Sequence, residues 1–414
     1  MKVFKFGGAS VRHATAIRQV GNLLKRYSGE PTLVVISAMG KTTNALERVA
    51  EALHRKQSPS GEIEALVAYH QEVIAGLLPE NHPIANEVKN LFVDLPHWAE
   101  KSLGFDALYD QVVSTGELVS TKIVSAFLEQ QNLPVKWVDA RQYIVSDNTY
   151  REGKVDWDAT RKLCQSLPGL MNTGIVVTQG FIAKSKEGLT TTLGREGSDY
   201  TAAIFAACLG AESVTIWKDV PGVMNADPKR LPDAITFDEL PFREAAEMTY
   251  YGASVIHPKT IKPLANHGIP LLVKNFDNPD LPGTKIYETK VDQLPPLIVF
   301  KDNQCLISCR VTDYTFIHEE QLSLIFTALS ELDIRINLMQ NSAISFSIVV
   351  DFREDKVLNL IQRLSSIFQV YYNTGLTLIT VKNYDTRTFD AYRKKPGVLL
   401  EQSSRSTLQV LIKP

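Results

Sequence analysis

The chain has 414 residues, and 44% of them are hydrophobic, which is enough for two or three domains with a sizeable core. Its 44 Lys and Arg residues nearly balance its 46 Asp and Glu residues, giving a net charge of −2. This balance excludes the broad positive field that nucleic-acid and membrane-surface binding need, so neither is expected as a partner. A compact site for small molecules is the better expectation.

No apolar run approaches the length of a membrane span, and the opening residues predict a strand with interleaved lysines instead of a signal peptide. We therefore expect a cytoplasmic protein. The cysteines are sparse, and no further Cys or His accompanies the closest pair, so a metal site is not expected. Buried, reduced thiols are predicted for Cys164, Cys208, Cys305 and Cys309.

The first half of the chain predicts strands that alternate with helices. Strand patterns at residues 2–6 and 32–36 each lead into a Gly-containing loop, and helical patterns follow at 14–27 and from 45 to 53. Alternating strands and helices are typical of a mostly parallel, doubly wound sheet. Ligands of such sheets gather at the carboxyl ends of the strands.

The next part of the chain continues the same alternation. Residues 58–103 predict a helical excursion broken by prolines, and residues 109–130 predict a long amphipathic stretch interrupted at Ser114–Glu117. Further strands are predicted at 135–139, 174–183, 214–217 and 271–274, and further helices at 200–209, 242–251 and 258–267.

The pattern changes around residues 284–299, where Pro295 and Pro296 mark a domain boundary. The strands and helices then follow the βαββαβ order of a ferredoxin-like module, up to residue 372. Beyond residue 375 three strands are predicted but no helix, because residues 386–395 are too few and too polar to supply an apolar face. The expected domains are therefore 1–297, 298–373 and 374–414.

The loop at residues 193–203 packs a cation, a carboxylate and two glycines into a turn between a predicted strand and an apolar helix. Free backbone N–H groups at such a helix start favour an anion, for example phosphate or carboxylate. The alternative is an ordinary helix start that Ser198 or Asp199 merely caps.

Two further segments carry candidate chemistry. Lys5 precedes the Gly7–Gly8 turn by two residues, so its ammonium can reach phosphates above the glycines, although a surface lysine on an edge strand is the alternative. Residues 218–229 follow a strand and form either a plain loop or a nucleotide clamp. In the clamp, Asp219 and the peptide groups near Val223 hold purine and ribose, and Lys229 faces phosphate.

Six motifs occur in the order found in the aspartate kinases, which this chain resembles over roughly its first 290 residues. They are Lys5–Ser10, Ser37–Gly40, Ser114–Glu117, Thr192–Asp199, Lys218–Pro228 and Tyr251–Pro258. The resemblance implies the amino-acid kinase fold, an α/β sandwich around a mostly parallel sheet. The C-terminal part resembles the ferredoxin-like ACT domains of that family, which implies a homo-oligomer formed through this region.

The resemblance also implies a reaction. The γ-phosphoryl group of ATP is transferred to the side-chain carboxylate of L-aspartate, giving 4-phospho-L-aspartate, the first step towards lysine, methionine, threonine and isoleucine. Lys5 would neutralise the transferring group and Asp199 would orient Lys5, while Mg²⁺ arrives with ATP and no protein side chain ligates it directly. Arg195 would grip a substrate carboxylate with its guanidinium, and Glu117 would accept hydrogen bonds from the substrate ammonium.

The resemblance assigns the remaining site residues to two groups. The implied aspartate pocket consists of Ser37, Thr43, Asn44, Glu117, Arg195 and Ser198. The implied ATP site consists of Lys5, Gly7, Gly8, Ser10, Lys218, Asp219, Val223, Met224, Asp227, Lys229 and Ser254.

The chain departs from the family pattern at several positions. Ala9 stands where Thr is usual, Glu196 where Gly is common, and Lys218 where Thr is frequent. Ser254 stands where the family often has a lysine that contacts ATP phosphates, and Lys218 or Lys259 is a candidate to replace that charge.

The predicted regulatory region departs further. Its first loop, residues 311–320, lacks the glycine that commonly lets backbone close on a bound amino acid. We predict that this region pairs strands in a dimer but senses amino acids poorly.

Two other functions stay open at this point. One is a kinase for another small carboxylate, such as glutamate, acetylglutamate or carbamate. The other is a non-catalytic sensor of amino acid and nucleotide, which the joint presence of Lys5, Glu117, Arg195 and Asp199 disfavours.

Overall fold

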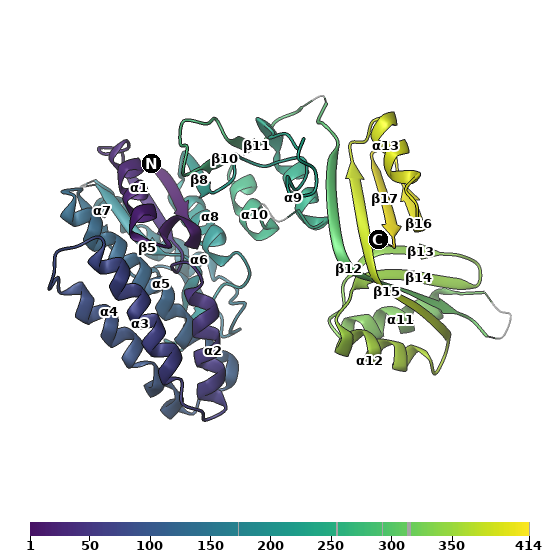
Figure 1. Ribbon diagram of the computed structural model, residues 1–414, viewed down its shortest axis with the longest axis horizontal. Helices are drawn as coiled ribbons and strands as arrows, with labels where there is room; N and C mark the ends of the chain where they lie inside the picture. Colours follow the sequence, from purple (N-terminus) through teal and green to yellow (C-terminus); the bar gives the residue numbers. More distant parts are fainter. Residues whose placement is uncertain (173, 254–255, 292, 313–315, 414) are drawn as a thin grey trace. The chain divides into compact units, whose positions relative to one another are not determined.

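The structure is a computed structural model that describes residues 1–172, 174–253, 256–291, 293–312 and 316–413 (Figure 1). The chain forms two compact units. The first unit comprises residues 1–223, 236–249 and 254–291, and the second comprises residues 224–235, 250–253 and 292–414.

The first unit contains an eight-stranded sheet in the order β3-β5-β2-β1-β8-β10-β11-β9. Its strands are β1 (Lys2–Phe6), β2 (Thr32–Ile36), β3 (Val135–Trp137), β5 (Ile175–Gln179), β8 (Ser213–Lys218), β9 (Glu239–Pro241), β10 (Leu271–Asn275) and β11 (Thr284–Tyr287). All neighbouring strands run parallel except β10 and β11. Every residue of β2 and β5 is buried, as expected for central strands covered on both faces. The predicted mostly parallel α/β class is confirmed.

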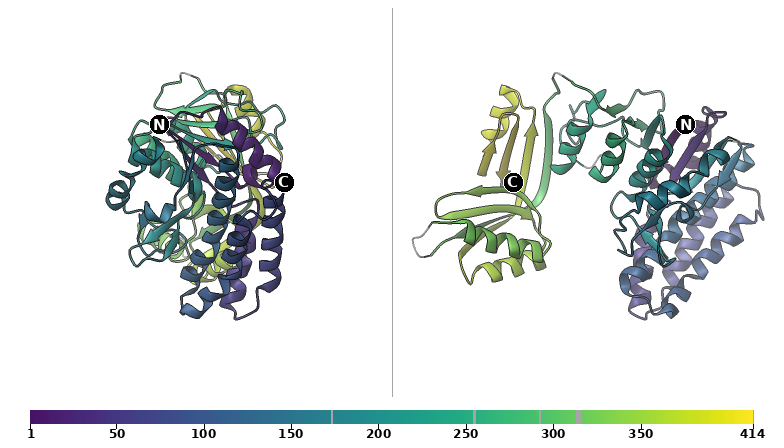
Figure 2. Two further views of the ribbon diagram at one scale, coloured as in Figure 1. Left: turned by 90° about the vertical axis from the view of Figure 1, so that its left-hand side faces the viewer. Right: turned by 180° about the vertical axis from the view of Figure 1, so that it is seen from behind.

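Helices cover this sheet (Figures 1 and 2). They are α1 (Ala14–Lys25), α2 (Thr42–His54), α3 (Ser60–Ala75), α4 (Ile84–Val93), α5 (Phe105–Gln130), α6 (Trp157–Cys164), α7 (Leu167–Met171), α8 (Gly197–Leu209), α9 (Phe242–Tyr250) and α10 (Pro258–Asn266), with 3-10 turns η1 (Gly8–Val11), η2 (Leu95–Lys101) and η3 (Ala140–Gln142). Phe4 and Phe6 share one core with α1 to α5. Because side chains alternate along a strand, Lys5 points to the opposite face, where α8 contacts β1.

The chain before α8 forms a separate three-stranded sheet. Its strands are β4 (Val145–Ser146), β6 (Ile182–Ser185) and β7 (Thr190–Thr192). The prediction of one strand over 174–183 is therefore wrong, since β5 and β6 belong to different sheets. The chain turns between them at Phe181, whose φ of 70° breaks the extended backbone.

The long helix α5 is continuous, so the predicted interruption at Ser114–Glu117 is also wrong. Gly116 fits inside the helix because α2 and the loop before it pack against it: an added Cβ would lie 3.1 Å from Leu46 Cδ1 and 3.0 Å from Ala38 Cβ. The Ser114 hydroxyl donates to the carbonyl of Gln111 at 2.9 Å. Tertiary packing thus overrides the low helix propensity of Ser, Thr and Gly.

The second unit contains a six-stranded antiparallel sheet in the order β13-β14-β12-β15-β17-β16. Its elements are β12 (Leu297–Arg310), α11 (Glu319–Glu331), β13 (Ile336–Asn341), β14 (Ser345–Asp351), α12 (Glu354–Leu364), β15 (Gln369–Lys382), α13 (Thr386–Arg393), β16 (Val398–Ser403) and β17 (Thr407–Ile412). The order of elements through β15 is the predicted βαββαβ order. The expected boundary at residues 373 and 374 falls inside β15, so both halves share one sheet, and the three-domain division stays a prediction.

Helix α13 corrects the expectation that the last segment has no helix. The Asp385 side chain caps it by accepting from the Thr388 N–H at 2.6 Å. Phe389 packs against Tyr384 in a tilted arrangement with ring centroids 4.8 Å apart, and Tyr392 is buried in the core that includes Val410. Two aromatic rings three positions apart supply the apolar face, although the segment is polar on average.

Within the described residues, no helix is long and apolar enough to cross a membrane.

All four cysteines are free thiols, and Cys164, Cys305 and Cys309 are buried as predicted, whereas Cys208 is only partly buried. Burial raises the pKa of the Cys305 and Cys309 thiols to about 11, which keeps them protonated at neutral pH.

Candidate active site

The site begins where β1, β2 and β8 end side by side. Phe6 pairs with Ile36 on one side and with Trp217 on the other, so Gly7, Ser37 and Lys218 lie at the same edge of the sheet. The turn after β1 passes very close to the loop after β2. An added Cβ at Gly8 would lie 2.7 Å from the carbonyl oxygen of Ala38, so only glycine fits at this position.

Lys5 and Asp199 meet at this edge. The Lys5 Nζ lies 2.7 Å from Asp199 Oδ1, and the two side chains are 11% and 4% exposed. An added Cβ at Gly7 would lie 3.5 Å from the same Nζ, so the ammonium sits directly beside the glycine turn. The second oxygen of Asp199 lies 4.0 Å from Lys218 Nζ. One buried carboxylate therefore holds two ammonium groups at the carboxyl ends of β1 and β8.

The start of α8 places Asp199 by close packing against the turn after β5. An added Cβ at Gly180 would lie 2.4 Å from Ser198 Cβ, and one at Gly197 would lie 2.6 Å from the Phe181 ring. The Phe181 N–H donates to Thr201 Oγ1 at 2.9 Å. These contacts fix the first turn of α8, which carries both predicted residues, Ser198 and Asp199.

The first N–H groups of α8 are less open than the sequence predicts. The N–H of Gly197 donates to the Gly194 carbonyl, and the N–H groups of Asp199 and Tyr200 donate to the Glu196 carbonyl. Neither Ser198 nor Asp199 caps the helix with its side chain, because Glu196 is the N-cap residue and has a φ of 53°. The positive groups at this edge are therefore the side-chain ammonium groups of Lys5 and Lys218 more than a bare helix start.

Arg195 projects from the loop between β7 and α8 and is exposed. In the described part of the chain, no carboxylate pairs with its guanidinium. Asp110 anchors the base of this loop, since it accepts bonds from the Thr192 N–H at 2.9 Å and the Thr192 hydroxyl at 2.8 Å. Burial raises the pKa of Asp110 to about 6, against these hydrogen bonds. The guanidinium is thus free to meet a substrate anion, and its loop is held in place.

Glu117 lies two helical turns after Asp110 on α5 and is buried. Its Oε1 accepts from the Ala38 N–H at 3.3 Å, while Oε2 has no hydrogen-bond partner among the residues that the structure describes. Burial raises the pKa of Glu117 to about 8, and the Ala38 N–H and the charge of Lys5 only partly offset this. A buried carboxylate oxygen without a donor is suited to receive one from a substrate.

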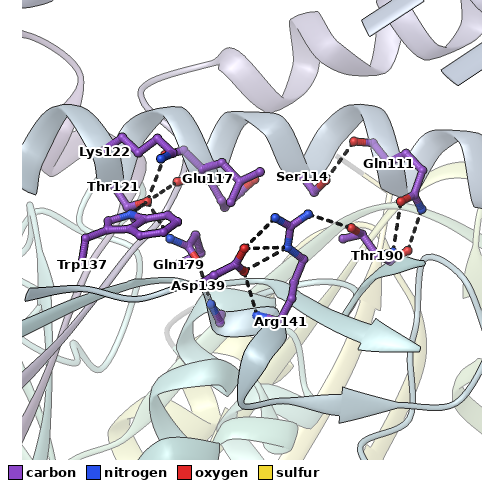
Figure 3. A network of polar contacts seen from close by, with 12 residues as sticks. Gln111, Ser114, Glu117, Thr121, Lys122, Trp137, Asp139, Arg141, Gln179 and Thr190 are labelled. Atoms are coloured by element: carbon purple, nitrogen blue, oxygen red, sulfur yellow. Dashed lines mark hydrogen bonds and ion pairs between the residues drawn. The ribbon is translucent and has the colours of Figure 1, made fainter. Parts of the chain in front are cut away.

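A polar network behind Glu117 was not foreseen from the sequence (Figure 3). The Thr121 hydroxyl donates to the Glu117 carbonyl at 2.9 Å and accepts from Gln179 Nε2 at 2.8 Å. Further along α5, Gln111 forms two hydrogen bonds with the backbone of Thr190, at 2.8 and 3.0 Å. This network ties the polar face of α5 to β5 and β7.

Arg141 belongs to the same network (Figure 3). Its guanidinium forms a bidentate pair with Asp139, at 2.6 and 2.9 Å, and donates to Thr190 Oγ1 at 3.1 Å. A signal for the network does exist in the sequence, because polar residues recur at helical spacing in an otherwise buried helix. They are Asp110, Gln111, Ser114, Glu117 and Thr121.

The remaining residues of the predicted aspartate pocket lie on the loop after β2 and on α2. Ser37 and Thr43 are partly buried, and Asn44 is exposed in the first turn of α2. The Ser120 hydroxyl donates to the Ser37 carbonyl at 2.7 Å, which links this loop to α5 as well.

The predicted ATP residues divide between the two units. In the first unit, Ser10 is buried in η1 and Asp219 is exposed. The peptide groups of Val223 are already bonded, since its N–H donates to Thr284 Oγ1 at 2.8 Å and its carbonyl accepts from the Phe237 N–H.

Three other predicted ATP residues, Met224, Asp227 and Lys229, belong to the second unit. There the Lys229 N–H donates to Asp227 Oδ1 at 2.9 Å, which shapes the loop locally. Ser254 lies outside the described residues. The other candidate for replacing the family's lysine, Lys259, is partly buried at the start of α10. Within the described chain, no group of three His, Cys, Asp or Glu side chains is arranged to hold a metal ion.

Comparison with known proteins agrees with this geometry. Residues 1–275 match the model of the amino acid kinase family. The lysine-sensitive aspartokinase 3 of Escherichia coli is 33% identical over 400 residues, which cover 92% of this chain and 87% of that protein. The chain spans only 32% of the length of the bifunctional aspartokinase/homoserine dehydrogenase 2 of Arabidopsis thaliana, to which it is 34% identical over 298 residues.

Solved structures of E. coli aspartokinase III are similar to this chain over its whole length. The E. coli aspartokinase III complex with aspartate and ADP (R-state) gives a TM-score of 0.84 at 30% identity and covers 100% of this chain and 96% of that one. The complex of the same enzyme with lysine and aspartate (T-state) gives 0.83 at 28% identity, with the same coverage. By sequence and by fold, this chain belongs to the amino acid kinase family, within its aspartokinase group.

Proposed function

We propose that this chain is an aspartate kinase, which transfers the γ-phosphoryl group of ATP to the side-chain carboxylate of L-aspartate to give 4-phospho-L-aspartate. The observation that carries the proposal is the buried Lys5–Asp199 pair beside the Gly7 turn, with the unpartnered oxygen of Glu117 on the neighbouring helix. The names of the related proteins support the choice of aspartate as the acceptor. The product enters the synthesis of lysine, methionine, threonine and isoleucine.

The reaction depends mainly on offsetting the repulsion between its two anionic reactants. A carboxylate is already a nucleophile at neutral pH, so the protein must bring two anions together and hold them in line. Lys5 neutralises the transferring phosphoryl group, and Asp199 fixes the position of the Lys5 ammonium. The Mg²⁺ that accompanies ATP would supply neutralisation of charge on the phosphate oxygens. No protein carboxylate is assigned to it as a direct ligand.

The aspartate pocket recognises both charged ends of the acceptor. Glu117 accepts hydrogen bonds from the substrate ammonium through its unpartnered Oε2. Arg195 grips a carboxylate with two parallel N–H groups, which a lysine cannot supply. Ser37, Thr43, Asn44 and Ser198 complete the pocket with hydroxyl and amide groups.

The ATP site is assigned to Lys5, Gly7, Gly8, Ser10, Lys218, Asp219, Val223, Met224, Asp227, Lys229 and Ser254. Gly7 and Gly8 let the phosphates approach the backbone closely. Lys218 supplies a second positive charge beside Asp199. The role of Val223 rests on its side chain, since its peptide group is already bonded.

We assign the whole protein to the cytoplasm. We also propose that it forms a homodimer through its second unit. Exposed apolar side chains on that unit's sheet support the dimer, among them Met339, Tyr371 and Tyr372. Residues 298–373 and 374–414 would form two ACT-like halves that follow a catalytic domain at 1–297. Light scattering of the purified protein tests the subunit number.

One assay separates this function from its rivals. ATP-dependent hydroxamate formation is measured with L-aspartate, L-glutamate and acetylglutamate side by side. An aspartate kinase gives product mainly with L-aspartate, whereas a kinase for another small carboxylate prefers one of the other acceptors. A non-catalytic sensor gives no product with any of them.

A further inference from the structure

Helix α3 contacts both loops that border the glycine turn of the site. The Tyr69 hydroxyl donates a hydrogen bond of 2.5 Å to the carbonyl of Arg12, at the end of η1. The same hydroxyl faces Gly40 in the loop after β2, where an added Cβ would lie 3.0 Å from it. Gly40 also has a φ of +52°, so a larger residue there is disfavoured by both backbone and space. One side chain thus touches the loop after β1 and the loop after β2.

These two loops are also joined directly to each other. The Gly40 N–H donates to the Gly8 carbonyl at 3.1 Å, and the Ser37 N–H donates to the Phe6 carbonyl at 3.1 Å. Tyr69 therefore closes a three-way contact, in which the position of one loop depends on the other and on α3.

The next residue of α3, His70, holds the start of α2. Its Nδ1 lies 2.7 Å from the Leu66 carbonyl, which can only accept, so Nδ1 carries the proton. Its Nε2 is then the acceptor for the Thr42 hydroxyl, 3.3 Å away. Thr42 is the first residue of α2 and directly precedes Thr43 and Asn44.

The ring of His70 is itself held firmly. It is buried, and its centroid lies 4.8 Å from that of Tyr69 and 4.9 Å from that of Phe92. Burial lowers the pKa of His70 to about 4, so the ring stays neutral near pH 7 and keeps its acceptor nitrogen for Thr42. The Tyr69–His70 pair therefore contacts the loop after β1 at Arg12 and the segment after β2 at Gly40 and Thr42.

We propose that Tyr69 and His70 are positioning residues for phosphoryl transfer. They act through the two loops, by keeping the phosphate-side turn at Gly7 and Gly8 at a fixed distance from the acceptor-side residues Ser37, Thr43 and Asn44. In-line transfer depends steeply on the alignment of donor and acceptor, so a small loop displacement slows it. This inference rests on the proposed kinase function.

The first test is Tyr69→Phe, which removes only the hydroxyl and leaves the ring against His70. Loss of one hydrogen bond to a loop should lower kcat/KM for aspartate by about 3- to 10-fold and weaken binding of the non-hydrolysable analogue AMP-PNP. Tyr384→Phe is the matched control, because the Tyr384 hydroxyl donates to the Ser404 carbonyl at 2.6 Å in the second unit. This control should shift Tm by a similar amount and leave the kinetics unchanged.

The second test uses Thr42, which avoids the folding risk of replacing buried His70. Thr42→Val keeps the shape and removes the donor, and it should lower kcat/KM for aspartate by about 3- to 10-fold. Thr42→Ser keeps the hydroxyl and should restore at least half of the wild-type value. A merely structural role would change Tm in all these variants without this split in kinetics.

The outcomes are distinct. Wild-type kinetics and AMP-PNP affinity in folded Tyr69→Phe, or equal damage by Thr42→Ser and Thr42→Val, would overturn the positioning role. Wild-type protein that fails to phosphorylate aspartate would refute the proposed function. If AMP-PNP binding in that case still weakens in Tyr69→Phe but not in Tyr384→Phe, the Tyr69 contact positions the nucleotide-side loop, and only the choice of aspartate as acceptor is wrong.

Discussion

Asp199 on α8 and Lys5 on β1 form a buried ion pair, with 2.7 Å between Oδ1 and Nζ, although 194 positions separate them in the chain. Each charge of this pair stabilises the other, because a buried charge that loses its partner strongly raises the free energy of the folded state. The pair lies where β1 ends and the glycine turn begins, so the Lys5 ammonium is available to an incoming anion. It is the electrostatic centre of the proposed reaction.

Replacing Lys5 by Ala or Met should lower kcat by about 10²-fold or more, since the charge that stabilises phosphoryl transfer is lost. Steady-state hydroxamate assays measure the effect. Lys2→Met is the matched control, because Lys2 lies on the same strand but pairs at the surface with Glu30 at 2.5 Å. A folded Lys5→Ala enzyme that works at full rate would refute the site assignment.

Lys218→Thr tests the second charge at Asp199. Because Lys218 Nζ lies 4.0 Å from Asp199 Oδ2, we expect it to contribute mainly to ATP binding, with KM for ATP rising about 5- to 10-fold. Lys274→Thr on the adjacent strand β10 is the control, since Lys274 lies over the Trp217 ring, 5.8 Å from its centroid. Unchanged ATP affinity in Lys218→Thr would count against its part in the site.

Much of this architecture could be predicted from the sequence, and the reasons are local. Strands β1 and β2 are short apolar runs followed by glycine turns, and their predicted bounds match the structure. The resemblance to the aspartate kinases, carried by short motifs, implies roles for Lys5, Glu117 and Asp199, and the structure brings Lys5 and Asp199 into contact.

The features that could not be predicted depend on partners far away in the chain. Gly116 does not break α5, because α2 packs against it. The bonds from Asp110 to Thr192 and from Gln111 to Thr190 span 82 and 79 positions, so no local pattern reveals them. The sequence predicts that peptide groups near Val223 face nucleotide, but no local pattern reveals that the Val223 N–H donates to Thr284 Oγ1, 61 positions later.

Arg195→Lys should raise KM for aspartate about tenfold or more, because an ammonium cannot form the bidentate contact with a carboxylate. KM for ATP should change much less, which separates weaker aspartate binding from a general loss of folded structure. Arg243→Lys is the control, since Arg243 forms an exposed pair with Glu247 on α9. Equal KM values for aspartate in Arg195→Lys and the wild type would remove Arg195 from the pocket.

Free lysine at sub-millimolar concentration should leave the rate of the wild-type protein nearly unchanged. The reason is the absence of glycine from residues 311–320, of which 313–315 lie outside the described part of the chain. Initial rates at fixed ATP and aspartate, measured with and without lysine, check this. Threonine serves as the parallel effector, and strong inhibition by either amino acid would show that sensing survives.

Glu117→Gln should remove a pH dependence of stability that the wild type shows. The folded pKa of Glu117 is raised to about 8 from its ordinary value of 4.5. Between these values the unfolded chain has lost the proton that the folded chain keeps, so the free energy of unfolding falls as pH rises towards 8. The fall attributable to this group is at most about 4 kcal/mol. Urea unfolding at pH 5, 6.5 and 8 measures it.

The same carboxyl group should govern substrate affinity in the opposite direction. Only ionised Glu117 attracts the substrate ammonium, so KM for aspartate in the wild type should fall as pH rises from 6.5 to 8, by up to about tenfold per pH unit. Glu117→Gln should show a higher KM without this slope. Glu87→Gln is the control, since Glu87 pairs at the surface with Lys122 at 2.5 Å and should retain both wild-type pH profiles. A pH-independent KM in the wild type would mean that Glu117 binds aspartate already ionised, or does not bind it.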